Sequence, residues 1–142
     1  MKTIRKNFGL KMFFFLIVIG GITACDVNDN VDNGPQYVYV ATTGVTGPAT
    51  AAINQEVTFN VSFKVDNNCG TFHSFYEEGS VTERTITVLA QYYGDCSVDP
   101  IPATRTAPYI FKSSTAGTFV LKFRVNNDGN SASFITQTIV VS

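Results

Sequence analysis

Apolar and polar residues alternate strictly across residues 56–65 (EVTFNVSFKV). Alternate side chains of an extended chain point to opposite faces, so this period of two predicts a β-strand with one buried face and one exposed face. The residues expected to be buried are Val57, Phe59, Val61, Phe63 and Val65. This segment predicts one half of a β-sheet core.

The same alternation returns near the end of the chain, over residues 118–125. Lys122 and Arg124 fall on the polar face, opposite the apolar residues Phe119, Leu121, Phe123 and Val125. A cluster of turn-forming residues follows at 127–130 (NDGN), and residues 133–141 are again rich in strand formers. This order predicts a C-terminal β-hairpin.

Weaker strand patterns lie between these segments, at residues 37–42, 71–76, 82–92 and 109–112. Glycine and proline separate them, and no helical apolar period is sustained after residue 36. Residues 97–108 contain three prolines and predict a stiff loop. Residues 37–142 are enough for one domain, and we expect an all-β sandwich of about seven strands.

The closing segment, residues 116–141, resembles the last hairpin of bacterial immunoglobulin-like domains. There, a glycine and an aromatic residue open a strand, and a Gly-Asn turn leads into the final strand. The residues that carry the resemblance are Gly117, Phe119, Leu121, Phe123, Val125, Asp128, Gly129, Asn130, Thr138, Ile139 and Val141. The resemblance covers about a quarter of the domain and implies an immunoglobulin-like fold, which by itself implies no particular function.

The first eleven residues include four basic ones, Lys2, Arg5, Lys6 and Lys11, and an apolar run at residues 12–22 and the sequence Ile22-Thr23-Ala24-Cys25 follow. This order is typical of a lipoprotein signal peptide over residues 1–24, with Cys25 as the lipidated residue. The alternatives are a transmembrane helix, for which the uncharged run is too short, and an ordinary cleaved signal, which would not need the cysteine. Several acyl chains on Cys25 would give stable membrane anchoring.

Residues 25–36 lack apolar periodicity and are rich in Asn, Asp and Gly, which predicts a disordered acidic tether. The acidic residues that follow Cys25 resemble the export signal of surface-exposed lipoproteins of the Bacteroidota, and this resemblance implies an outer-membrane, cell-surface location. In the enterobacterial system, Asp26 directly after the cysteine resembles an inner-membrane retention signal instead. A periplasm-facing position therefore stays open beside the surface.

The charge balance changes once the signal peptide is set aside. The chain has ten basic and eleven acidic residues, and four of the basic but none of the acidic residues precede Cys25, so the remainder carries a net charge of −5. This balance argues against nucleic acid as a partner, because a binder would need a basic face.

Two further cysteines, Cys69 and Cys96, are an even pair in a chain with an export signal, which favours a disulfide. A metal site is the alternative, but two cysteines and a single histidine give no recognised ligand spacing. Their positions also depart from the immunoglobulin pattern, in which the cysteines lie within strands and flank a tryptophan. This chain has no tryptophan.

Candidate chemistry along the chain is sparse. The only histidine, His73, precedes Glu77 and Glu78, which we interpret as an exposed turn before Gly79. No nucleophile elbow, zinc-protease helix or phosphate loop occurs, and the Asp/Asn-rich segments fail the glycine and glutamate positions of a calcium loop. We therefore expect neither enzyme activity nor a metal or cofactor.

Aromatic residues gather in the middle third of the domain, where aromatic side chains more often belong to the core, while exposed tyrosines could stack on sugar rings or anchor a protein partner. Tyr92 shares a face with Ile86 and should be buried, whereas Tyr93 should be exposed. Beside the proline-rich loop, Tyr93, Tyr109 and Arg105 are the candidate binding residues. The expected function is an anchored, non-catalytic binding module, acting as an accessory subunit or adhesion domain that binds a protein. A glycan-binding lipoprotein and a protease inhibitor are the alternatives.

Overall fold

Nine β-strands form two sheets that pack face to face in the computed structural model, which describes residues 34–94, 101–126 and 132–142. The strands are β1 (Gln36–Val40), β2 (Thr42–Thr46), β3 (Thr50–Ala51), β4 (Val57–Val65), β5 (Thr71–Gly79), β6 (Glu83–Tyr92), β7 (Ala103–Phe111), β8 (Gly117–Arg124) and β9 (Phe134–Val141). All nine lie in one unit, Val31–Ser142. The predicted all-β sandwich is confirmed, with nine strands instead of about seven.

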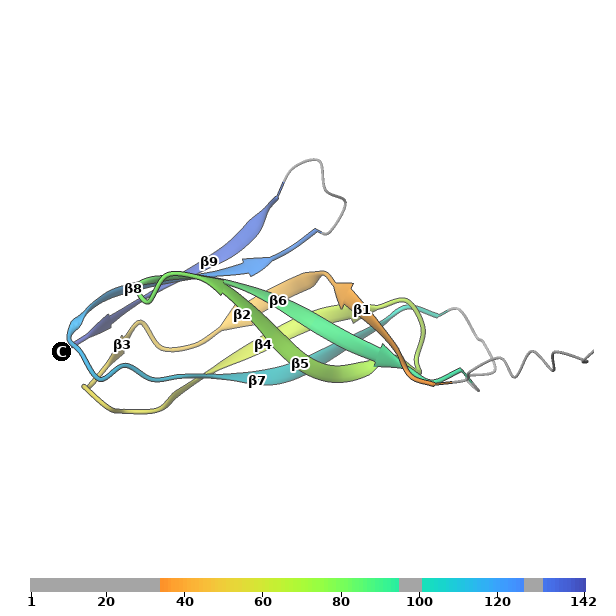
Figure 1. The fold of residues 1–142 in the computed structure, drawn as a ribbon, viewed down its shortest axis with the longest axis horizontal. Helices are drawn as coiled ribbons and strands as arrows, with labels where there is room; N and C mark the ends of the chain where they lie inside the picture. Colours follow the sequence, from red (N-terminus) through yellow and green to blue (C-terminus); the bar gives the residue numbers. More distant parts are fainter. Residues whose placement is uncertain (1–33, 95–100, 127–131) are drawn as a thin grey trace, which may run out of the picture. The chain divides into compact units, whose positions relative to one another are not determined.

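The larger sheet has six strands, and β6 is its central element (Figure 1). Strand β5 pairs along one side of β6. On the other side, β1 pairs with the C-terminal half of β6 and β8 pairs with its N-terminal half. Strands β9 and β3 continue the sheet beyond β8. Strand β6 therefore has neighbouring strands on both sides over most of its length.

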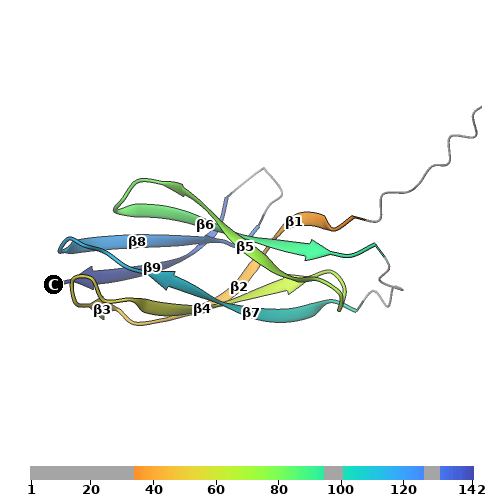
Figure 2. The ribbon, with the colours of Figure 1, turned by 60° about the horizontal axis from the view of Figure 1, so that its bottom comes forward.

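The smaller sheet has the order β2-β4-β7, and it forms the second layer (Figure 2). Strand β4 is the segment with the strictest alternation, and its five apolar residues are at most 7% exposed. The opposite layer contributes buried side chains of β6, β8 and β9, namely Ile86, Val88, Ala90, Phe119, Leu121, Phe123, Ile139 and Val141. Burial of these apolar side chains between the two sheets holds the layers together.

Strand β7 begins at Ala103, six residues earlier than its pattern predicts. The prediction of a stiff loop is therefore wrong for residues 103–108, and residues 97–100 lie outside the described part of the chain. Pro108 is accommodated because β7 is an edge strand, where a missing N–H need not remove a ladder hydrogen bond.

Two other element boundaries differ between the sequence prediction and the structure. Glu77 and Glu78 belong to β5 and are exposed there, so the turn predicted at these residues is wrong, and the turn begins after Gly79. Gly79 has a φ of 114°, a conformation that favours glycine, at the start of the connection to β6. Strand β1 begins at Gln36, the last residue of the predicted tether.

The C-terminal hairpin is confirmed, since β8 and β9 pair antiparallel over eight residue pairs. Its predicted turn at residues 127–130 lies outside the described residues, as do the predicted signal peptide, Cys25 and most of the predicted tether. Within the described ranges, no helix is long and apolar enough to cross a membrane.

Candidate binding surface

Four exposed tyrosines lie on the outward face of the larger sheet, where β1, β6 and β5 run side by side. Strand β1 alternates so that Val40 points into the core while Tyr37 and Tyr39 point outward, at 51% and 47% exposed. Tyr76 on β5 and Tyr93 just after β6 are 49% and 54% exposed. We call the surface formed by Tyr37, Tyr39, His73, Tyr76, Gln91 and Tyr93 the tyrosine platform.

The platform rings meet across β6. Tyr37 on β1 and His73 on β5 have ring centroids 4.5 Å apart, and Tyr39 and Tyr76 have centroids 6.0 Å apart. The backbones of β1 and β5 are two strand spacings apart, about 10 Å, so these side chains lean over β6 toward each other. Thr87, which is opposite Tyr76 on β6, is only 5% exposed. The rings therefore cover Thr87, whereas Leu89 and Gln91 on the same face of β6 stay partly exposed.

A β-bulge brings His73 into this surface. The register between β5 and β6 shifts between Phe72 and Ser74, which leaves His73 as the extra residue. A bulge of this kind re-aims a side chain. The Nδ1 atom of His73 lies 3.2 Å from Oε1 of Gln91, and the amide nitrogen of Gln91 donates to the Tyr93 hydroxyl at 3.4 Å. Polar contacts thus link the platform residues of β5 and β6.

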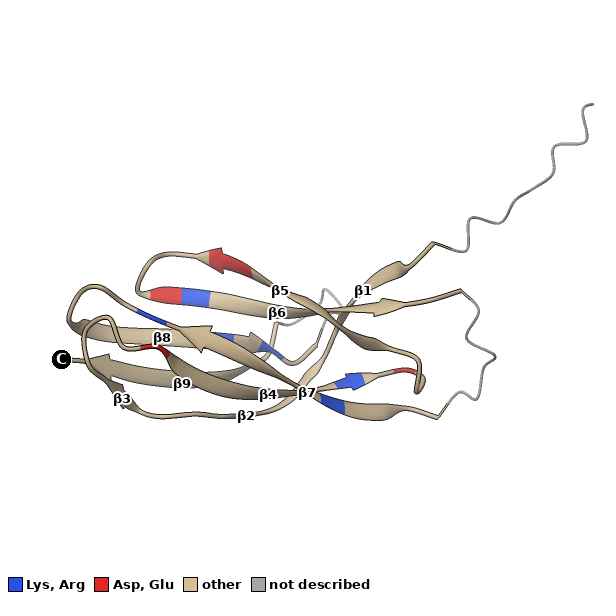
Figure 3. Cartoon of the chain, turned by 90° about the horizontal axis from the view of Figure 1, so that it is seen from below, with Lys and Arg blue, Asp and Glu red and all other residues tan. Residues whose placement is uncertain are grey.

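Charged side chains are absent from the strand segments that form the platform, which are residues 36–40, 71–76 and 85–92. Figure 3 shows the charged residues elsewhere, including the far end of β5 and β6. There, Glu78 pairs with Arg124 at 3.4 Å, and Glu83 on β6 pairs with Lys122 on β8. The outward face of the larger sheet is therefore divided into a neutral aromatic half and an ionic half.

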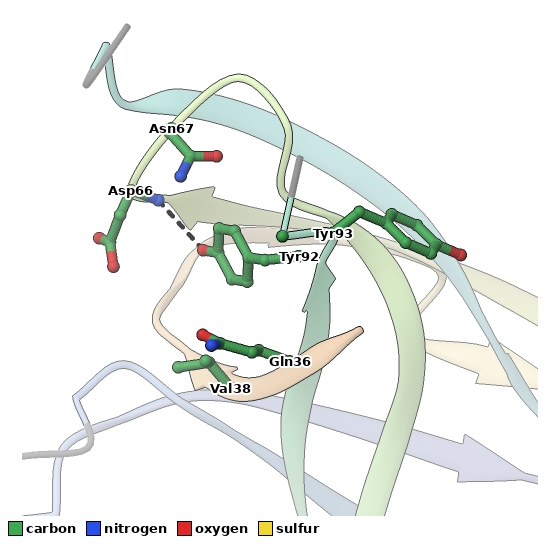
Figure 4. Close-up of a pocket in the computed structure, with 7 residues that line it drawn as sticks. Gln36, Val38, Asp66, Asn67, Tyr92 and Tyr93 are labelled. Carbon is green, nitrogen blue, oxygen red and sulfur yellow. Dashed lines mark hydrogen bonds between the residues drawn. The ribbon is translucent and has the colours of Figure 1, made fainter. Parts of the chain in front are cut away.

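A pocket of about 340 Å³ lies at the same end of the sandwich but on the other side of β1 and β6. Gln36, Val38, Asp66, Asn67 and Tyr92 line it together with backbone at Tyr93 and Gly94. Figure 4 shows the Tyr93 ring pointing away from the other side chains. The half-buried Tyr92 hydroxyl accepts a hydrogen bond from the Asp66 N–H at 3.2 Å, which ties the pocket wall to β4.

The three candidate binding residues do not form one surface. Tyr93 is exposed, as predicted, and belongs to the platform. Arg105 is exposed on β7 of the smaller sheet, where its Nη2 donates to the Asn68 carbonyl at 2.6 Å. Tyr109 is 2% exposed, so its assignment to a binding surface is wrong. Its position on β7 between the buried residues Ala107 and Phe111 places it on the core face.

The hydroxyl of Tyr109 has an unusual environment for a polar group. It is buried and has no hydrogen-bond partner among the described residues. Burial raises the pKa of Tyr109 from 10.0 to about 12, and the Glu77 carboxylate acts in the same direction, against the opposing effect of Arg84. The group is therefore held neutral in the folded protein well into the alkaline range.

This shift predicts a loss of stability between pH 10 and pH 12. Because the folded state binds the phenol proton more tightly than the unfolded state, the free energy of unfolding should fall as pH rises through this window, by about 3 kcal/mol at most. Tyr109→Phe should remove this contribution and cost little at pH 7, where the lost hydroxyl had no partner. Urea unfolding of the parent and the variant at pH 7 and at pH 12 measures how much stability each loses between these two pH values. Equal losses in the two proteins would contradict the prediction.

Cys69 lies in the connection after β4, where its N–H donates to Oδ1 of Asn67 at 3.0 Å. Cys96 lies outside the described residues, so the Cys69–Cys96 bridge stays a prediction. Among the described residues, no group of three His, Cys, Asp or Glu side chains could hold a metal ion.

Sequence reasoning missed most of the platform, although the signal was present. The alternation of QYVYV at residues 36–40 places two valines on one face and Tyr37 and Tyr39 on the other, which marks these tyrosines as outward. No protein-family model, curated protein or solved structure matches this chain.

Proposed function

We propose that this protein is a membrane-anchored, non-catalytic binding module, an accessory or adhesion domain at the bacterial outer membrane. The observation that carries the proposal is the tyrosine platform. Tyrosine is enriched at binding hot spots because its ring gives a large contact area at little conformational cost, and its hydroxyl adds a hydrogen bond. Contiguous exposed apolar patches often mark interaction sites.

The anchor and the tether complete this proposal. The sequence pattern around Cys25 supports a lipid attachment, and the acidic segment before β1 supports display of the domain away from the lipid surface. The acidic residues after Cys25 favour export to the cell surface. The protease-inhibitor alternative is weakened, because half of the proline-rich segment that suggested it, residues 103–108, belongs to β7.

Recovery of the full-length lipidated protein from gently solubilised membranes tests the proposal. We expect the parent protein to fractionate with the membrane and to bring down a companion, detected either as a protein or as a polysaccharide. Tyr39→Ala together with Tyr76→Ala should lose most of that companion, because the pair of rings over Thr87 is removed. The matched control is Ile110→Ala, which removes a 52% exposed apolar side chain from β7 of the smaller sheet.

Two results would count against the proposal. A protein found only in the soluble fraction would contradict the anchor. Equal companion recovery by the platform variant and the Ile110→Ala control would contradict the binding role of the platform. Thermal unfolding of both variants checks that each remains folded, which we expect because the substituted side chains are exposed.

A further inference from the structure

The chemistry of the tyrosine platform indicates what kind of ligand it binds. The platform combines aromatic faces with neutral hydrogen-bonding groups: four phenol hydroxyls, the His73 imidazole and the Gln91 amide. A pyranose ring has the complementary pattern, because its C–H groups form an apolar face and its hydroxyls surround the rim. A sugar that lies on a tyrosine ring can therefore contact the ring with its face and a nearby polar group with its edge.

The ring pairs are arranged in series along the sheet. Tyr37 with His73 and Tyr39 with Tyr76 form two successive pairs, with centroid separations of 4.5 and 6.0 Å. Tyr37 and Tyr39 are two residues apart on β1, so the two pairs follow each other at about 7 Å. Two pairs at this spacing offer a chain two successive contacts along β1. The surface can therefore accept consecutive units of a chain better than a single sugar.

Charge restricts the ligand further. The strand segments of the platform contain no Asp, Glu, Lys or Arg, and the chain after the signal peptide has a net charge of −5. The nearest basic groups of the outward face, Lys122 and Arg124, pair with Glu83 and Glu78. An acidic polysaccharide would find no cation on the platform and would be repelled by the net charge. The complementary ligand is neutral.

We propose that the tyrosine platform binds a neutral polysaccharide chain, whose consecutive pyranose rings stack on the Tyr37–His73 and Tyr39–Tyr76 pairs. This inference rests on the proposed binding function and names its ligand class. The Gln91 amide lies between the two edges of the platform, where it can bond to sugar hydroxyls. A protein partner on the same surface is the competing outcome of the test.

Tyrosine emission provides a direct measurement, because the chain has no tryptophan and four of its six tyrosines belong to the platform. The full-length protein in detergent is titrated with soluble β-glucan, xyloglucan, mannan, arabinoxylan and, as the acidic comparison, polygalacturonate. We expect saturable changes in emission with at least one neutral chain and none with polygalacturonate. Affinity gel electrophoresis with the same polysaccharides checks binding independently of emission.

Variants separate stacking from nonspecific adsorption. Tyr37→Ala and Tyr39→Ala should each weaken binding about tenfold, since each removes one stacking surface. Tyr39→Phe should retain more affinity than Tyr39→Ala because the ring remains. Ile110→Ala should bind as the parent does, because its side chain lies on the smaller sheet.

The outcomes distinguish this inference from the function on which it rests. Absence of binding to every neutral chain, with a protein companion still lost in the Tyr39→Ala, Tyr76→Ala double variant, would overturn the glycan assignment and leave the binding module in place. Glycan binding that all platform variants retain would also overturn it. Loss of neither companion nor glycan in any variant would overturn both proposals.

Discussion

Phe123→Ala should lower the free energy of unfolding by about 3–5 kcal/mol, the cost of removing a large aromatic side chain from a packed core. Phe123 is fully buried on β8 and lies between the two sheets. Its ring is 5.6 Å from that of Tyr109 and 6.4 Å from that of Phe59, both on the opposite sheet. The substitution therefore leaves a cavity at the contact between the layers. Small domains have total stabilities of about 5–15 kcal/mol, so a large part is lost.

Urea unfolding followed by circular dichroism measures this loss. Ile110→Ala is the matched control, because it shortens an apolar side chain that is 52% exposed, and it should change stability by less than about 0.5 kcal/mol. Phe123→Leu should fall between the two, since leucine refills part of the cavity. A Phe123→Ala loss no larger than that of the control would mean that the two sheets can close over the missing ring.

The fold was predictable where the sequence alternates without interruption. The inward residues of β4 and β8 were assigned correctly because a period of two leaves one set of side chains for the core. The edge strand β7 was missed over its first residues because prolines usually exclude a strand. That rule applies to central strands, whereas β7 is an edge strand. The sequence does not reveal which strands pair, so it could not show that β7 lies at an edge.

The candidate site was harder to predict because the presence of an aromatic residue does not by itself tell whether its side chain is buried in the core or exposed on the surface. Tyr93 was assigned correctly from its place in the alternation of β6, whereas Tyr109 was grouped with it by composition although its own strand places it inward. The platform depends on side-chain contacts between β1 and β5, which are far apart in sequence. The two strands do not pair with each other, because each pairs with β6, which lies between them. The bulge that brings out His73 has no clear signal in the sequence.

Gly47→Ala should destabilise the protein by about 1–3 kcal/mol, the cost of forcing an additional group into a packed site. A Cβ atom at Gly47 would lie 2.1 Å from Cδ1 and 2.7 Å from Cγ of Phe59. Because Phe59 is fully buried against the opposite sheet, its ring cannot rotate away without displacing core neighbours such as Phe123. The chain between β2 and β3 therefore packs so closely over the β4 ring that only glycine fits.

A double-mutant cycle tests this cause directly. Phe59→Ala removes all of the ring atoms that the new methyl group would strike, so Gly47→Ala should cost less in the Phe59→Ala background than in the parent, with a coupling energy of at least about 0.5 kcal/mol. Gly44→Ala is the control in the same segment, because its Cβ would meet Ser62 at 3.8 Å, an ordinary contact. Additive losses in the cycle, or equal losses at Gly44 and Gly47, would show that residues 47–49 can move away from the core. The passage of the chain from β2 in the smaller sheet to β3 in the larger sheet would then depend on the β2–β4 and β3–β9 pairings instead of on the contact between Gly47 and Phe59.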